Sequence, residues 1–359
     1  MKNKKIKLAI IFGGRSAEHE VSVISARNIL KVIDRNKYDI SLVGIDKKGN
    51  WLNFNQKELL KEDSGMFARK DLSNLVVPFS KDGKFYFQIG NKNKNIEVVF
   101  PVLHGPFGED GTIQGLFKLY NVPFVGPGVL GSAVAMDKDA AKRLFKEAGL
   151  LIGKFISFSY LEKNKLIFNE IKKFLGLPFF IKPANLGSSV GISKVRDEKE
   201  FKKAIKLAFA YDTKIIIEEF IKGKEIECAV LGNENPQAST VGEIIPTHDF
   251  YSYEAKYLDE NGAKMKIPAD ISKSLVKEFQ DLSIKAFKIL GCEGIGRVDF
   301  FLTDNNKIYI NEINTIPGFT SISMYPKLWE SSGLSYMKLI DQVIKLAIDR
   351  HKKENGLKN

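Results

Sequence analysis

Two carboxylates and an amide near the end of the chain, Asp299, Glu312 and Asn314, have the chemistry of a metal site. They lie in the segment 296–319, whose pattern predicts two strands joined by a polar turn. Because residues two apart on a strand share a face, closing this hairpin would bring the three groups together beside Arg297. Two carboxylates and an amide oxygen form the hard donor set that Mg²⁺ prefers. The same pattern also fits a solvated hairpin with a surface salt bridge.

A second group of residues has the chemistry of a phosphate site. A predicted strand at 179–182 ends at Lys182 and leads into a loop of small residues at 187–191. Small residues let backbone amides approach phosphate oxygens closely, and a lysine adds a positive point charge. The loop lacks the GxxxxGK[ST] pattern and precedes a strand rather than a helix. We therefore predict a strand–loop–strand phosphate lid, with a plain hairpin turn as the alternative.

The chain also predicts a nucleotide wall and a lid over it. The strand at 214–217 runs into Glu218, Glu219, Phe220 and Ile221, which could present backbone groups and an apolar wall to a flat ring. Glu225 follows within reach of a sugar hydroxyl, although an ordinary half-buried strand with a charged end fits this stretch equally. The segment 242–270 is rich in tyrosine and charge and has little periodicity, which is typical of a closing loop.

The elements that must position these groups begin with an N-terminal βαβ unit. It consists of a strand at 6–12, a glycine turn, a helix that Ser16 could cap, and a strand at 40–45 that ends at Asp46. The turn sequence GGRSAE lacks the third glycine of GxGxxG, which argues against an NAD site. The glycine turn and helix N-terminus still suit a carboxylate or a phosphate. Glu18 beside that terminus is either a favourable dipole partner or a ligand contact.

His104 follows a buried strand at 98–103 and opens the glycine-rich loop HGPFGEDG. Open α/β sheets bind ligands at the carboxyl ends of their strands, which is where this histidine would lie. The neighbouring glycines and acids favour a site here, although a lone histidine also serves purely structural roles.

Composition bounds the remaining possibilities. A chain of 359 residues is long enough for two or three domains, and 44% hydrophobic with 27% charged residues is ordinary for a globular protein. The net charge of +12 admits nucleic acid binding, but the lysines are spread out and no aromatic–arginine pattern is present. No apolar run approaches the ~20 residues of a membrane span, and the N-terminal apolar run is too short for a signal peptide. The two cysteines and four histidines are too scattered for a disulfide framework or a zinc site.

Taken together, the motifs resemble those of the D-alanine–D-alanine ligase family of ATP-grasp enzymes. In chain order they are GGRSAEHEVS, HGPFGEDGTIQG, MDKDAAK, IKPANLGSSVGISKV, EEFIKGKEIE, FYSYEAKY, GRVDFF and INEINTIPGFT. The resemblance implies an α/β chain with an N-terminal Rossmann-like parallel sheet, followed by two α+β lobes that clasp ATP. We place these domains at 1–125, 126–217 and 218–359.

The resemblance implies a role for each site residue. Phosphates and adenosine of ATP would be bound by Lys142, Lys182, Ser189, Lys256, Glu218, Glu219, Phe220, Ile221 and Glu225. Two Mg²⁺ ions, which Mn²⁺ could replace, would be held by Asp299, Glu312 and Asn314. Glu18 would bind the ammonium of a first D-alanine, with His104 near its carboxylate. Ser188 and Tyr257 would form a hydrogen-bonded network with Glu18. Arg297 and the Gly318 N–H would stabilise an oxyanion, and Ser323 and Met324 would contact a second D-alanine.

The implied reaction joins two D-alanine molecules in two steps, through a D-alanyl phosphate, to give a peptidoglycan precursor. The implied setting is the cytoplasm, and the implied assembly is a homodimer. Enzymes of this fold that make the D-alanine–D-lactate depsipeptide depart from the YEAKY pattern of the lid, which this chain keeps at 253–257. We therefore favour the dipeptide. The alternatives are a D-lactate or D-serine ligase, another ATP-grasp ligase, a basic nucleic-acid-binding module and a non-catalytic nucleotide sensor.

Overall fold

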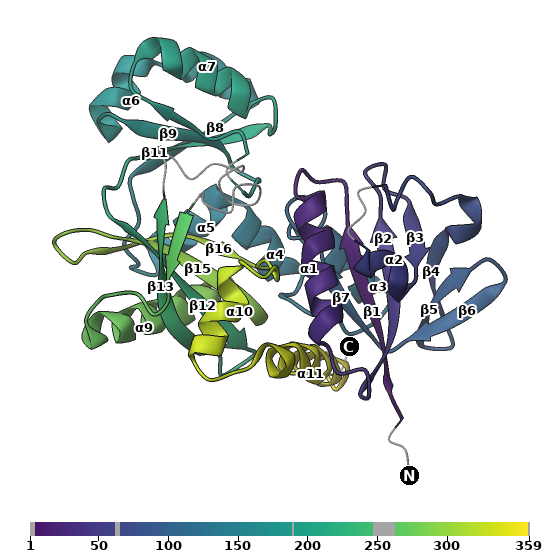
Figure 1. The fold of residues 1–359 in the computed structure, drawn as a ribbon. Helices are drawn as coiled ribbons and strands as arrows, with labels where there is room; N and C mark the ends of the chain where they lie inside the picture. The colour runs from purple at the N-terminus through teal and green to yellow at the C-terminus, as the bar shows by residue number, and fades with distance from the viewer. Residues whose placement is uncertain (1–3, 62–64, 189, 247–262, 358–359) are drawn as a thin grey trace.

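The computed structural model describes residues 4–61, 65–188, 190–246 and 263–357. The described strands form four sheets. Figure 1 shows three lobes, with the N-terminal sheets on the right, the C-terminal sheet at lower left and a smaller lobe above it. This arrangement fits the predicted α/β class.

The N-terminal lobe is built on a sheet of order β3–β2–β1–β7, in which β1 pairs in parallel with both β2 and β7. Its strands are β1 (Ile6–Gly13), β2 (Tyr38–Ile45), β3 (Trp51–Phe54) and β7 (Val98–Val102). A second sheet is formed by β4 (Val76–Lys81), β5 (Lys84–Ile89) and β6 (Lys92–Ile96). The helical elements are α1 (His19–Val32), α2 (Gln56–Leu60), η1 (Leu72–Asn74) and α3 (Thr112–Leu119). The carboxyl ends of β1 and β7 carry the glycine turn and His104, as the sequence predicts.

The upper lobe holds an antiparallel sheet of order β10–β9–β11–β8. Its strands are β8 (Phe155–Ser159), β9 (Phe179–Pro183), β10 (Ser193–Val195) and β11 (Lys214–Glu219). Its helical elements are η2 (Tyr160–Lys165), α6 (Phe168–Leu175) and α7 (Glu198–Ala208), and α4 (Val129–Met136) and α5 (Lys138–Glu147) lead into it. The predicted strand–loop–strand is confirmed, because β9 pairs antiparallel with β10 across the glycine–serine loop.

The C-terminal sheet has the order β14–β13–β12–β15–β16, and all of its pairings are antiparallel. Its strands are β12 (Lys224–Gly232), β13 (Gln237–Pro246), β14 (Ala263–Lys266), β15 (Gly294–Leu302) and β16 (Ile308–Asn314). The helices are α9 (Lys273–Ile289), α10 (Met324–Ser331) and α11 (Tyr336–Asn355). The predicted hairpin is confirmed, since β15 and β16 pair with Asp299 opposite Glu312 and Arg297 opposite Asn314.

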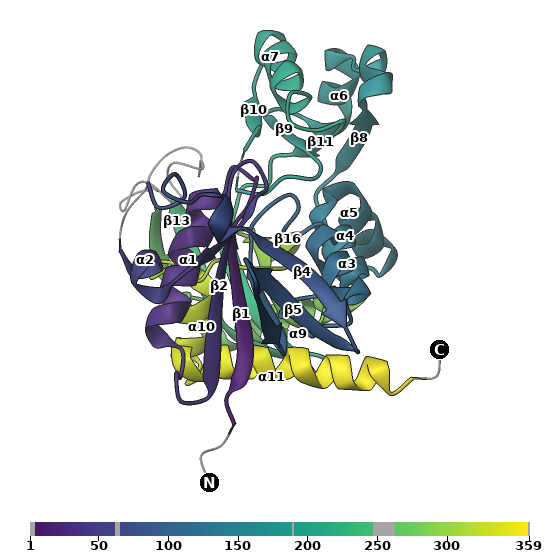
Figure 2. The ribbon, with the colours of Figure 1, turned by 90° about the vertical axis from the view of Figure 1, so that its right-hand side faces the viewer.

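One hydrophobic core joins the two ends of the chain. It contains Phe12 and Phe100 from the first sheet together with Phe319, Tyr325 and residues of α11. The rings of Phe100 and Phe319 lie 5.7 Å apart, and Figure 2 shows α11 running beneath the molecule. The predicted domain limits stay a prediction. The strand β11 crosses the predicted limit between 217 and 218. The shared core contains residues from both sides of the predicted limit between 125 and 126.

Three helix predictions need correction. The alanine- and lysine-rich pattern of 136–148 predicts one helix, but α5 begins at Lys138, because the Asp137 side chain accepts hydrogen bonds from two backbone N–H groups and caps it. The pattern of 329–350 likewise predicts one closing helix, but α10 ends at Ser331 and α11 begins at Tyr336, with Gly333 between them at a φ of +89°, which an α-helix does not allow. Ser16 does not cap α1; its hydroxyl donates to the His104 carbonyl at 2.7 Å. Among the described residues, no helix is long and apolar enough to cross a membrane.

Candidate active site

The hairpin β15–β16 presents its polar side chains on one face, as strand alternation predicts. Arg297 donates to both carboxylate oxygens of Asp299, at 2.8 and 2.7 Å, and lies 2.8 Å from a carboxylate oxygen of Glu227. The amide nitrogen of Asn314 donates to Asp299 at 2.9 Å, which turns its amide oxygen away from that carboxylate. A guanidinium between two carboxylates is thereby fixed in orientation, with its charge compensated inside the protein.

Lys138 links this hairpin to the glycine–serine loop. Its ammonium lies 3.3 Å from a carboxylate oxygen of Glu312 and donates to the Leu186 carbonyl at 2.6 Å. Its backbone N–H donates to the Ala184 carbonyl at 3.0 Å. Because Lys138 is itself buried, it couples the positions of Glu312 and the loop.

Two lysines share one carboxylate above the hairpin. Lys142 of α5 and Lys182 of β9 both pair with Glu218 of β11, and the Lys142 pair measures 3.0 Å. All three side chains are buried. Burial would raise the pKa of Glu218, but the two ammonium groups overcome it and hold that pKa below its ordinary value. Burial lowers the pKa of Lys142, whereas Glu218 and Glu312 outweigh burial at Lys182 and raise its pKa. These positive groups suit a polyphosphate.

Glu18 meets the glycine–serine loop across the lobes. The Ser188 hydroxyl donates to its carboxylate. Gly105 and Gly187 also lie against this carboxylate, and a Cβ at Gly105 would come within 2.6 Å of it. A side chain at Gly105 would therefore push Glu18 aside, which explains the glycine in the HGPFG motif. Glu18 is 7% exposed, so a cation brought to it would be well shielded from water.

These groups line one small cavity of about 80 Å³. It brings together most of the residues predicted for substrate and metal, namely Glu18, His104, Ser188, Arg297, Glu312, Asn314, Gly318, Ser323 and Met324. Asp299 lies directly behind it through its bonds to Arg297 and Asn314. His104 lines the cavity, but its ring nitrogens contact the Ile316 carbonyl and the Ser25 hydroxyl.

The predicted adenine wall lies where β11 passes into β12. The Glu219 carboxylate accepts a hydrogen bond from the Lys154 N–H at 2.7 Å. Phe220 is 39% exposed and is flanked by the ring of Phe180 at 6.1 Å and the ammonium of Lys194 at 4.2 Å. Ile221 and Glu225 follow, and Glu225 pairs with Ile244 and Phe301 in the sheet. Glu218 differs from its neighbours, because its carboxylate is engaged by lysines.

The sequence interpretation missed two charged residues of this site. Glu227 alternates with Glu225 on β12 and is paired with Asp299 in the register, so strand periodicity alone could have found it. Lys138 lies one helical turn before Lys142, which carried the same signal. Glu109 is one of the acids that the sequence places in the His104 loop, and only its partner, the Ile316 N–H, required the tertiary structure. The predicted residues Ser189, Lys256 and Tyr257 lie outside the described residues.

The hairpin residues fit a divalent cation by their chemistry. Asp299 and Glu312 are opposite one another in the register, and Asn314 adds an amide oxygen on the same face. No cluster of three or more histidine, cysteine, aspartate or glutamate side chains suited to a metal occurs in the part of the chain that the structure describes. An asparagine and nucleotide phosphates would have to complete the coordination.

Comparison with known proteins decides the family. The D-ala D-ala ligase N-terminus model matches residues 7–127, and the D-ala D-ala ligase C-terminus model matches residues 144–345. The chain is 52% identical to a D-alanine–D-alanine ligase of Oceanobacillus iheyensis over 99% of this chain and 98% of that protein. This chain belongs to the D-alanine–D-alanine ligase family. It is therefore an ATP-dependent ligase, as the motifs predict.

Solved structures of the same fold agree with this membership. The D-alanine–D-alanine ligase of Coxiella burnetii superimposes with a TM-score of 0.87 at 40% identity, covering 98% of this chain and 96% of that one. The VanG D-Ala:D-Ser ligase of Enterococcus faecalis superimposes with a TM-score of 0.85 at 39% identity, covering 96% and 100%. The ATP-grasp fold is thus confirmed, and membership implies the use of ATP and of a divalent metal ion.

Proposed function

We propose that this chain joins two D-alanine molecules to D-alanyl-D-alanine in a reaction that converts ATP to ADP and phosphate, as a step in making peptidoglycan precursors in the cytoplasm. The observation that carries the proposal is the cavity itself. An ammonium site at Glu18, an oxyanion site at Arg297 and Gly318, and a carboxylate hairpin line one space. Lys142 and Lys182, which could bind a polyphosphate, lie close enough to Glu312 of the hairpin for its charge to affect both. This is the set that a carboxylate–amine ligase requires.

In the first step the carboxylate of one D-alanine attacks the γ-phosphate of ATP. Two anions must meet, so positive charge has to neutralise the developing transition state. Lys142 and Lys182 would bind the phosphates, which replace Glu218 as their partners. Mg²⁺ held by Asp299, Glu312 and Asn314 would supply further neutralisation when bound. The carboxylate of Glu18 would hold the ammonium of the first D-alanine. The Ser188 hydroxyl donates to the Glu18 carboxylate and so fixes its orientation.

In the second step the amine of another D-alanine attacks the acyl phosphate, and phosphate leaves. The tetrahedral intermediate carries an oxyanion, which the Arg297 guanidinium and the Gly318 N–H would stabilise. Ser323 lies next to Gly318, because a Cβ at that glycine would come within 2.6 Å of its hydroxyl. Ser323 and Met324 would contact the second D-alanine. The segment with Lys256 and Tyr257 would close over the reaction.

The test is D-alanine-dependent phosphate release with mass analysis of the product, with D-lactate and D-serine as competitors. We expect D-alanyl-D-alanine as the product. A mixed product would be consistent with the fold but would overturn our choice of second substrate. The VanG D-Ala:D-Ser ligase shows that this fold can also serve D-serine. Tyr257→Phe should let D-lactate compete better while ATP binding persists. Absence of release with any D-amino acid would refute the proposal.

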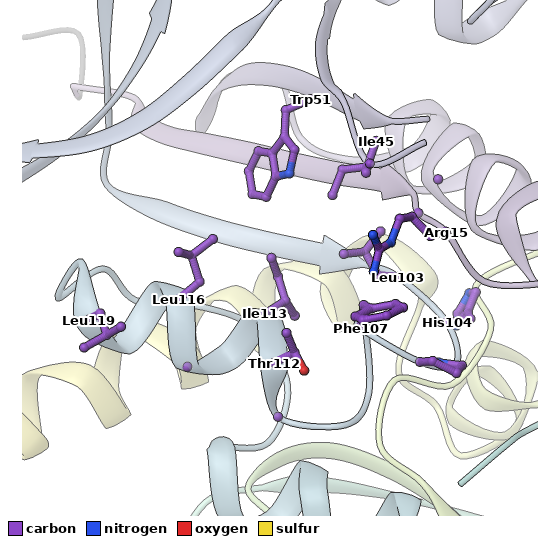
Figure 3. A pocket seen from close by; sticks show the side chains of 17 residues that line it. Arg15, Ile45, Trp51, Leu103, His104, Phe107, Thr112, Ile113, Leu116 and Leu119 are labelled. Carbon is purple, nitrogen blue, oxygen red and sulfur yellow. The ribbon is translucent and has the colours of Figure 1, made fainter. Parts of the chain in front are cut away.

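We also propose a homodimer, which the family resemblance implies. A pocket of about 640 Å³ on the N-terminal lobe is lined mainly by apolar side chains, and in Figure 3 Ile113, Leu116 and Leu119 of α3 line one side of it opposite Ile45 and Trp51. Leu119 is 87% exposed. A second copy packed on this face would cover it.

Light scattering tests the dimer. Leu119→Glu should shift the protein toward the monomer. Leu161→Glu is the matched control, because Leu161 is 91% exposed on the upper lobe, away from this face. A dimer that tolerates Leu119→Glu as well as it tolerates Leu161→Glu would exclude this surface.

A further inference from the structure

Three side chains of the N-terminal lobe form hydrogen bonds with the backbone that follows β16. The Ile316 N–H donates to the Glu109 carboxylate at 2.9 Å, and the Ile316 carbonyl lies 3.0 Å from Nδ1 of His104. The Phe319 N–H donates to the Ser25 hydroxyl at 3.2 Å. The segment 316–319 is therefore held at both of its ends by side chains of the N-terminal lobe.

These contacts form one continuous chain of hydrogen bonds. A carbonyl can only accept, so Nδ1 of His104 carries the proton and Nε2 is the acceptor. The Ser25 hydroxyl, 3.4 Å from Nε2, is then the donor to it, and the serine oxygen can accept from Phe319. The second oxygen of Glu109 accepts from the Gly105 N–H at 2.8 Å. Every member of the chain has a defined direction.

Burial makes this arrangement costly to disturb. Ser25 is fully buried and His104 is 5% exposed. Burial also lowers the pKa of His104 to about 4, so the ring is neutral at neutral pH, as its two contacts require. The aromatic contact between Phe100 and Phe319 already joins the lobes here. The hydrogen bonds, unlike that apolar contact, also fix the orientation of the peptide groups at 316–319.

Gly318 lies between Ile316 and Phe319, the two residues whose backbone groups form these hydrogen bonds. The Ser323 hydroxyl also lies close to it. We propose that Ser25 and Glu109 are positioning residues, which act through His104 and the Ile316 peptide to aim the Gly318 N–H at the reacting carbonyl. This inference rests on the proposed function. It assigns to His104 a second task beyond proximity to a substrate carboxylate.

The two chemical steps respond differently to loss of this positioning. The first step depends on the lysines, the hairpin and the Glu18 site, whereas the hydrogen bonds of Ser25 and Glu109 go to His104, Gly105 and the backbone of 316–319. The second step depends on the oxyanion donor. If that donor is displaced, the acyl phosphate persists until water attacks its carbonyl carbon. The bond from carbon to the phosphate oxygen then breaks, and D-alanine and inorganic phosphate are released without dipeptide.

The experiment therefore measures phosphate released per dipeptide formed. The variants are Ser25→Ala and Glu109→Gln, placed at opposite ends of the chain of hydrogen bonds. Ser22→Ala is the matched control. Ser22 is equally buried one turn earlier on α1 and accepts from the Gly13 N–H at 2.7 Å, but it bonds the first sheet instead of 316–319.

We expect dipeptide turnover to fall roughly 10- to 100-fold in both variants, since displacing an oxyanion donor costs up to the effect of deleting it. The phosphate-to-dipeptide ratio should rise well above one, with the KM for ATP within about twofold of wild type. The control should keep a ratio of one.

A ratio of one in both variants would overturn the proposal, whatever their turnover, because a purely structural role slows both steps alike. If one variant does not fold, the other still decides. Failure of the wild type to make dipeptide would instead refute the proposed function.

Discussion

Replacing Glu218 with glutamine tests the charge arrangement above the hairpin. The carboxylate of Glu218 is the shared partner of Lys142 and Lys182, and the three side chains are 7%, 3% and 8% exposed. Glu218→Gln keeps the shape and removes the negative charge. Two buried ammonium groups then lose the carboxylate that they share, and the carboxylate of Glu312 remains as a charge that acts on both.

The magnitude follows from the burial. Removing one partner of a buried ion pair costs about 3–5 kcal/mol of unfolding free energy. Two features favour the lower end: the amide oxygen can still accept one hydrogen bond, and Lys142, whose pKa is already lowered chiefly by burial, can release its proton. We expect a loss of about 3 kcal/mol, which is roughly a hundredfold in the folded-to-unfolded ratio.

Urea denaturation without nucleotide measures this loss. The neighbouring Glu219→Gln is the control, because its carboxylate accepts from the Lys154 N–H and an amide oxygen can do the same. We expect that control to stay within about 1 kcal/mol of wild type. A Glu218→Gln protein as stable as the control would refute the argument from buried charge.

Nucleotide binding to Glu218→Gln then separates two roles. If Glu218 serves as the resting partner of the lysines, ATP should bind the variant at least as tightly as wild type, since the phosphates no longer displace a carboxylate. If its carboxylate contacts adenine, ATP affinity should fall. Isothermal titration with a non-hydrolysable ATP analogue distinguishes these outcomes.

Three further predictions concern the cavity. Gly318→Ala places a Cβ within 2.6 Å of the Ser323 hydroxyl, so kcat should fall by about 10²-fold, as for a lost oxyanion donor; unchanged steady-state kcat would contradict that role. His104 should remain a neutral Nδ1–H tautomer at pH 6 in nitrogen NMR spectra, because burial lowers its pKa to about 4. Its folded pKa lies below the unfolded value, so the stability it contributes is present above about pH 6.5 and is lost as the pH falls toward 4; a midpoint near 6.5 would contradict the network. Lys138→Met removes the ammonium 3.3 Å from Glu312, so nucleotide-free Mn²⁺ binding, followed by electron paramagnetic resonance, should tighten by about fivefold; weaker binding would show that Lys138 orders the site instead of competing for it.

The hairpin was predictable because its information is local. Arg297 and Asp299 alternate with buried apolar residues, the turn is polar, and the register follows once the turn closes. The helix boundaries were less predictable. Asp137 reads as one more polar residue within an alanine- and lysine-rich stretch, and only its geometry shows that it ends one helix and caps the next.

The partners of the charged residues could not be predicted from sequence. The strand end at Glu218 predicted a wall for a flat ring, and the family resemblance assigned that ring as adenine, but the bonds of Glu218 to lysines of α5 and β9 depend on three elements meeting. Glu109 is similar, since its acceptor role towards the Ile316 N–H joins residues more than two hundred positions apart. Periodicity fixes the face a side chain takes, whereas the neighbour across that face is set by tertiary packing.

The ion pairs of the site have a common consequence for binding. They comprise four cations and four anions, namely Lys138, Lys142, Lys182 and Arg297 with Glu218, Glu227, Asp299 and Glu312. A metal ion alone would compete with Lys138 and Arg297 for its carboxylates, and ATP alone would compete with Glu218 for its lysines. When both bind, Lys142 and Lys182 exchange Glu218 for phosphates, and Asp299 and Glu312 exchange Lys138 and Arg297 for the metal. The metal and the phosphates carry opposite charges, so together they change the net charge of the buried site less than either component alone. The internal pairing therefore favours the metal–nucleotide complex over either component.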